Sequence, residues 1–138
     1  MAKLLRQDLV QLSQQWIEDA RVLLAANRYP GAYHAGGVAL ECILKARIAS
    51  LTQAEEFPDK RLAEMAWKHD PPTLLALGDL GKFLNQASPA VRTNWTTVKD
   101  WKVESRYTRT MNPASVTAFV DALDDPMDGV LTWLRNHC

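Results

Sequence analysis

Residues 28–48 constrain the fold more than any other part of the sequence. They read RYPGAYHAGGVALECILKARI. On a helix, where successive residues turn by about 100°, apolar or small side chains from this segment cover most of the circumference. A helix with so little polar surface needs neighbours on most of its sides. We therefore expect residues 31–51 to form the central helix of a bundle.

Apolar residues that recur every three or four positions predict three further long helices. They span residues 3–27, 89–102 and 113–134, the last with a kink at Pro126. Asp70 and Asn112 each precede a proline, as helix N-caps do, and a Leu-rich helix is expected after Asp70. A short helix is also expected over residues 59–67.

No segment alternates apolar and polar residues as a strand does. The expected fold is therefore all-α: an up-and-down bundle of four main helices plus one or two short helices. A chain of 138 residues fits one domain, so we expect a single unit over residues 1–138.

The charge balance argues against a long-range attraction to nucleic acid or to an acidic membrane. Sixteen Lys and Arg residues balance sixteen Asp and Glu residues, so a local patch must hold any such partner. The cysteines and histidines lack metal-ligand spacing, and dinucleotide, P-loop and serine-hydrolase motifs are missing from the sequence. We expect no metal and no cofactor, and Cys42 is predicted to be a small buried hydrophobe.

Neither a signal-like N-terminus nor an apolar run of about 20 residues occurs in the sequence. The two cysteines make no disulfide framework. These features predict a cytoplasmic protein with no membrane segment.

One stripe of the central helix is polar. His34, Glu41 and Lys45 share it, because spacings of seven and four residues return to the same helix face. In one interpretation Glu41 and Lys45 form an ordinary i,i+4 pair and His34 lies at the surface. In the other, the stripe faces a partner or ligand. Gly36 and Gly37 indicate close approach of another element, since each costs about 1 kcal/mol relative to Ala in a helix.

Two other clusters carry polar or aromatic side chains suited to ligand binding. His69 stands just before the expected helix N-terminus, where backbone N–H groups receive anions, although His69 and Asp70 are also simple capping residues. Residues 95–109 interleave aromatic and cationic side chains, which stack on bases and hold phosphates. The members are Trp95, Lys99, Trp101, Lys102, Arg106, Tyr107 and Arg109. In the simpler interpretation the tryptophans, Trp95 above all, belong to the core and the cations face solvent.

In their order and spacing, these segments resemble the HEPN family of helical domains (higher eukaryotes and prokaryotes nucleotide-binding). The resemblance covers nearly the whole chain. It rests on Trp16 and Leu23-Leu24 in the first helix and on RYPGAYHAGGVALECILKARI, FPDK, HDPPTLLAL and WTTVKDWKVESRY. It implies an all-α homodimer from a prokaryotic toxin–antitoxin or defence system, often encoded beside a small nucleotidyltransferase.

Many HEPN domains are metal-independent RNases whose active site is an Arg followed, after a short spacer, by a His. Such a His handles the proton of the 2′-OH or leaving group, while the Arg stabilises charge on the phosphorane. After Arg106, the positions for that His hold Met111, Asn112 and Pro113. The spacing recurs between Arg28 and His34, at the start of the central helix rather than near the last helices.

The leading hypothesis is therefore a HEPN-like binding module without the standard RNase chemistry. Its partner would be a nucleotidyltransferase-type protein, a nucleotide or RNA. The expected binding residues are Arg106, Tyr107, Arg109, Trp101, Glu41, Lys45 and His69. The alternative is a metal-independent RNase in which Arg106 works with His69 or His34. A third hypothesis is a structural adaptor, whose Arg106 would be held in intramolecular salt bridges.

Overall fold

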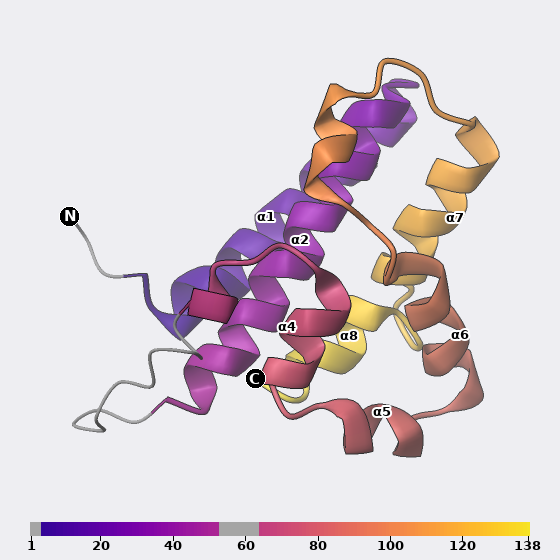
Figure 1. Ribbon diagram of the computed structural model, residues 1–138. Helices are drawn as coiled ribbons and strands as arrows, with labels where there is room; N and C mark the ends of the chain where they lie inside the picture. The colour runs from indigo at the N-terminus through magenta and orange to yellow at the C-terminus, as the bar shows by residue number, and fades with distance from the viewer. Residues whose placement is uncertain (1–3, 53–63) are drawn as a thin grey trace.

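The computed structural model describes residues 4–52 and 64–138, and in this part of the chain all regular structure is helical. The prediction of an all-α bundle is confirmed. Two long helices, α1 (Arg6–Ala25) and α2 (Tyr29–Ser50), run antiparallel, and shorter helices pack around them (Figure 1). None of the described helices has the length and apolarity that a membrane crossing requires.

A tight turn with defined hydrogen bonds joins α1 to α2. Asn27 adopts the left-handed conformation, with φ of 61°. The N–H of Arg28 donates to the carbonyl of Leu23 at 2.8 Å, and the N–H of Asn27 donates to Leu24 at 3.0 Å. This pair of bonds is a Schellman motif, which satisfies the last carbonyls of α1. Helix α2 then begins at Tyr29, two residues earlier than the sequence predicts, with Pro30 in its first turn.

Helix α2 is the central element, as its sequence predicts. It packs against α1, α4 (Pro71–Leu77), η1 (Val103–Tyr107), α7 (Pro113–Asp124) and α8 (Val130–Arg135). Its two adjacent glycines face different neighbours. Gly36 lies against Phe119 and Leu123 of α7, and Gly37 lies against the indole of Trp101. The close approach indicated by these glycines is thereby confirmed.

The segment between α2 and α7 consists of short helices. Asp70 caps α4 by accepting the N–H of Thr73 at 3.1 Å, as predicted. Helices α5 (Gly81–Gln86) and α6 (Pro89–Val98) follow. The helix predicted over residues 89–102 is wrong at its end, because the chain leaves α6 after Val98 and turns Trp101 into the core. Of the short helix expected over residues 59–67, positions 64–66 are helical and 59–63 lie outside the described residues.

The long helix predicted over residues 113–134 is also wrong: it is divided into α7 and α8. The carboxylate of Asp125 accepts the N–H groups of Met127 at 2.9 Å and Asp128 at 2.8 Å. These bonds hold a turn that competes with helix continuation. Pro126 has no N–H to continue the helix, so a full break replaces the expected kink.

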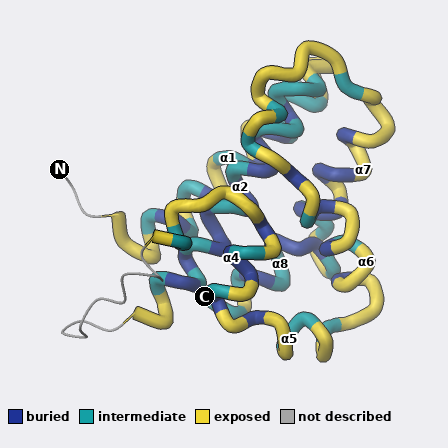
Figure 2. Tube along the Cα trace, viewed as in Figure 1, coloured by how far each residue is buried: buried dark blue, intermediate teal, exposed yellow. Residues whose placement is uncertain are grey.

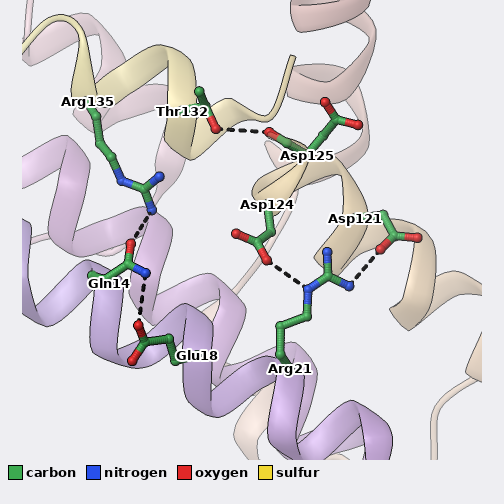
Figure 3. A network of polar contacts seen from close by, with 8 residues as sticks. All are labelled: Gln14, Glu18, Arg21, Asp121, Asp124, Asp125, Thr132 and Arg135. Atoms are coloured by element: carbon green, nitrogen blue, oxygen red, sulfur yellow. Dashed lines mark hydrogen bonds and ion pairs between the residues drawn. The ribbon is translucent and has the colours of Figure 1, made fainter. Parts of the chain in front are cut away.

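A polar network holds α1 against the two C-terminal helices (Figure 3). Arg21 donates to Asp124 and to Asp121, each at 2.8 Å, and Arg135 donates to Gln14 at 2.8 Å. These side chains are partly exposed, so each ion pair contributes about 1 kcal/mol or less. The fork of Arg21, which binds two carboxylates of α7, fixes how the two helices are aligned.

Candidate functional site

The polar stripe of α2 faces His69 and the segment of residues 101–109. Along α2, Gly31 lines a cleft together with Arg109. Three residues further, His34 lies near enough to Arg106 for that positive charge to lower its pKa. Further along, Gly37 touches Trp101 and Glu41 binds His69. The segment therefore lies antiparallel to α2. The stripe thus faces other residues that the sequence singled out, and the hypothesis that it faces a partner or ligand stays a prediction.

Glu41 and His69 form a carboxylate–imidazole pair between α2 and the loop before α4. Nδ1 of His69 donates to Oε1 of Glu41. The Glu41 side chain is 14% exposed and the His69 side chain is 50% exposed, so a largely buried carboxylate orients an accessible ring. With Nδ1 engaged, Nε2 is the nitrogen left to exchange a proton or bind a ligand. Lys45 lies 3.8 Å from the other Glu41 oxygen, which is the predicted i,i+4 pair.

A pocket of about 380 Å³ opens beside this pair, and we call it the His69 pocket. It is lined by Lys68, His69, Asp70, Trp101, Lys102, Val103 and Glu104. Its volume lies in the range of small-molecule sites, about 300–1,000 Å³. Within residues 4–52 and 64–138, neither Lys68 nor Lys102 is paired with a carboxylate. Two lysines without an ion pair in the described residues, together with the carboxylates of Asp70 and Glu104, therefore line the pocket next to an oriented imidazole.

His34 precedes Glu41 by seven residues, about two helical turns, and its ring lies between two tryptophan rings. Its ring centroid is 6.4 Å from that of Trp16 and 6.4 Å from that of Trp101. Burial lowers the pKa of His34, the charge of Arg106 lowers it further, and the charge of Glu41 acts in the opposite direction. Burial and the charge of Arg106 therefore favour the neutral form of His34. Its Nδ1 is buried and, among the described residues, has no hydrogen-bond partner.

Arg106 and Tyr107 project from η1 into solvent. The Nη2 of Arg106 donates to the Tyr107 hydroxyl at 3.1 Å, and the guanidinium carbon lies 4.9 Å from the centre of the Tyr107 ring. Tyr107 is 74% exposed. Over the described part of the chain, Arg106 makes no salt bridge. This arrangement differs from the one that a purely structural adaptor requires.

The remaining predicted site residues are divided between the core and a second cleft. Trp101 is 1% exposed, so it forms a wall of the His69 pocket and presents no open ring face. Trp95 is buried, as predicted. Arg109 lies away from the His69 pocket, in a cleft that it shares with Arg28. The sequence pointed to Arg28 only through its spacing from His34, and Lys68 was not singled out.

Cys42 is buried, and burial raises the pKa of its thiol to about 11. A thiol with this pKa stays protonated at neutral pH, so the prediction of an inert, hydrophobic Cys42 agrees with its environment. Among the described residues, no group of three or more His, Cys, Asp and Glu side chains is placed to hold a metal ion.

The electrostatic coupling along the stripe predicts opposite effects of two substitutions on His34. Arg106→Gln removes a positive charge, so we expect the pKa of His34 to rise. Glu41→Gln removes a negative charge, so the same pKa should fall. The measurement is a pH titration of the imidazole C–H signals by NMR. Lys82→Gln, which changes an exposed cation beside Phe83 of α5, is the control. Equal titration of His34 in wild type and Arg106→Gln would contradict the geometry.

No protein-family model, curated protein or solved structure matches this chain. The resemblance to HEPN domains therefore stays a prediction.

Proposed function

We propose that this chain is a HEPN-like helical module that binds single-stranded RNA, through the His69 pocket and the exposed Arg106–Tyr107 pair. In this proposal the module belongs to a cytoplasmic toxin–antitoxin or defence-type system. It forms a homodimer and works with a nucleotidyltransferase-type partner. Its support is the resemblance of the sequence segments to the HEPN family and the all-α fold, whereas the standard Arg–His RNase motif is missing from its usual place.

The observation that carries the proposal is a group of cations without acidic partners around one pocket. Lys68 and Lys102 line the His69 pocket, Arg106 follows on η1, and none of the three is paired with a carboxylate in the described residues. Such cations bind phosphates because counterions are released from the nucleic acid. The overall charge of the chain is zero, and Asp70 and Glu104 line the same pocket, so in this proposal the attraction comes from direct contacts of these cations with phosphates.

Tyr107 adds a second, independent feature. Its ring is exposed and lies against the Arg106 guanidinium. Exposed aromatic rings stack on bases of single strands, and each stacked base contributes about 1–3 kcal/mol with little sequence preference. An aromatic ring beside a phosphate-binding cation favours a single strand over a duplex, whose bases are already stacked.

The Glu41–His69 pair favours a second candidate function, a metal-independent RNase. In this mechanism Nε2 of His69 takes the proton from a ribose 2′-OH, and the 2′-oxygen attacks the adjacent phosphorus. The bond to the 5′-oxygen breaks, and the protonated His69 returns the proton to this leaving oxygen. The products are a 2′,3′-cyclic phosphate and a 5′-OH. Lys102 or Arg106 would stabilise the charge of the phosphorane.

One experiment tests both candidates. Purified protein is titrated into a fluorescently labelled single-stranded RNA in EDTA at 0.1 M salt, and anisotropy is recorded. We expect Lys102→Gln/Arg106→Gln to weaken binding about 25-fold, since each phosphate contact to a single strand contributes about 5-fold at this salt concentration. Arg92→Gln removes an exposed charge on α6 and is the matched control, with an effect below about twofold.

The same samples are then resolved on a denaturing gel. If the chain is an RNase, His69→Ala should slow cleavage by about 100-fold or more, while Arg92→Gln leaves it unchanged. Binding without cleavage by the wild-type protein would eliminate the RNase candidate and leave the binding module. Failure of the wild-type protein to bind RNA even at 50 mM salt would refute the proposed function.

A further inference from the structure

We propose that the cleft between Arg28 and Arg109 is a second phosphate site, and that an RNA strand bound at the His69 pocket runs along α2 to reach it. This inference rests on the proposed function. It adds a second binding site, a path for the RNA strand along α2 and a minimum length for an RNA that occupies both sites.

The cleft, which we call the Arg28 cleft, lies at the end of the α1–α2 hairpin. Its volume is about 500 Å³, and it is lined by Leu23, Asn27, Arg28, Pro30, Gly31 and Arg109. No acidic side chain belongs to this lining. In the described residues neither guanidinium has an ion-pair partner. Two arginines without acidic partners on one cleft suit a phosphate chemically, because a guanidinium binds phosphate through two parallel N–H groups.

The backbone that carries Arg28 is already ordered. The Schellman motif fixes the turn, with the Arg28 N–H bonded to Leu23 at 2.8 Å. The Tyr29 hydroxyl also donates to the side-chain oxygen of Asn27 at 2.9 Å. Binding at Arg28 therefore requires ordering of one side chain rather than of a loop, which reduces the entropic cost of the contact.

The two sites lie in line along α2. The segment after Trp101 follows α2 through η1 and then passes over the end of the hairpin (Figure 1). Arg106 comes between the sites, close enough to His34 to lower its pKa. From residue 106 to residue 110 this segment is exposed, whereas Val103 and Ser105 of η1 are half-buried (Figure 2). A strand would thus meet the His69 pocket, then Arg106 and Tyr107, and finally the Arg28 cleft.

The helical rise sets the length of RNA that can occupy both sites. Glu41, at the His69 pocket, and Gly31, at the Arg28 cleft, are ten residues apart on α2. They are therefore separated by about 15 Å, at about 1.5 Å per residue. With about 3.4 Å per phosphate along a stacked strand, this distance is spanned by four to five nucleotides. Shorter oligonucleotides reach one site at a time.

The test compares Arg28→Gln/Arg109→Gln with wild type and with Arg92→Gln, using labelled single-stranded RNAs of two and eight nucleotides. For the eight-nucleotide RNA at 0.1 M salt, we expect the double variant to bind about 25-fold more weakly. Its slope of log affinity against log salt should be smaller in magnitude by about 1.4, which corresponds to two lost phosphate contacts. For the two-nucleotide RNA, anchored at the His69 pocket, the double variant and wild type should bind equally. Thermal unfolding of each variant confirms that it is folded.

The outcomes separate this inference from the proposed function. If wild type binds the eight-nucleotide RNA and the double variant matches it in affinity and salt slope, the Arg28 cleft is no part of the track and the proposed function stands. An equal loss of affinity for both RNA lengths would also overturn the proposed path along α2, because it would place both RNAs at the Arg28 cleft. If wild type binds neither RNA at 50 mM salt, the proposed function and the track both fail.

Discussion

Replacing Gly37 by alanine is expected to lower the free energy of unfolding by about 3 kcal/mol. A Cβ at this position would lie 1.8 Å from Cε2 of Trp101 and 2.0 Å from its Nε1. Trp101 is 1% exposed and belongs to the core, so an indole displaced toward the His69 pocket would lose core contacts. Alanine gains about 1 kcal/mol of helix propensity over glycine, which offsets only part of the overpacking. Thermal unfolding should show a Tm lower by about 10 °C.

Gly81→Ala is the matched control for this prediction. A Cβ at Gly81 meets no atom within 4 Å, and the residue begins α5. Its stability should change by less than about 0.5 kcal/mol. In a Trp101→Ala background the clash is removed, so Gly37→Ala should there become neutral or stabilising. A loss of stability of the same size in both backgrounds would show that the indole is not what limits residue 37.

Gly129→Ala is expected to cost a similar amount, about 3 kcal/mol, for a different reason. The new Cβ would lie 2.5 Å from the carbonyl oxygen of Asp125 and 2.7 Å from that of Leu123. These are backbone atoms at the end of α7, and the Gly129 N–H itself donates to the Asp125 carbonyl at 3.0 Å. The clash is relieved only if the turn between α7 and α8 opens. Equilibrium denaturation in urea measures the resulting loss of unfolding free energy.

Met127→Ala is the control within the same turn. The side chain is 84% exposed, so its truncation should change the stability by less than about 0.5 kcal/mol. If Gly129→Ala were as stable as Met127→Ala, the turn between α7 and α8 would have room for a Cβ at residue 129, contrary to this prediction.

The predictions that rested on local chemistry are those that the structure confirms. Asp70 and Asn112 cap their helices because a cap bonds to N–H groups within the next three residues: Thr73 and Ser115 are the donors. At Pro126 the local signal was incomplete. Proline predicts an interruption, whereas the break is held by the Asp125 carboxylate, in a turn that Gly129 fits because it has no Cβ.

In the candidate site, too, some features follow from local sequence and others depend on contacts between distant residues. Helical periodicity was sufficient to place His34, Glu41 and Lys45 on one stripe and to pair Glu41 with Lys45. The bond from His69 to Glu41 joins residues 28 positions apart, and no local pattern identifies such partners. The separation of Arg109 from the His69 pocket likewise follows from the path of residues 101–109 over the hairpin.

The sequence by itself determined that an apolar helix covers about residues 31–51, found at 29–50, and that its glycines admit a close neighbour, since period and side-chain volume are local properties. Only the tertiary structure decided that the neighbour of Gly37 is Trp101, which thereby becomes a wall of the His69 pocket. Several helices carry an apolar face that could pack against α2, and the sequence pattern alone does not distinguish among them. Which faces meet depends on the short connections and on the packing of the whole core, and these place the cations beside the polar stripe.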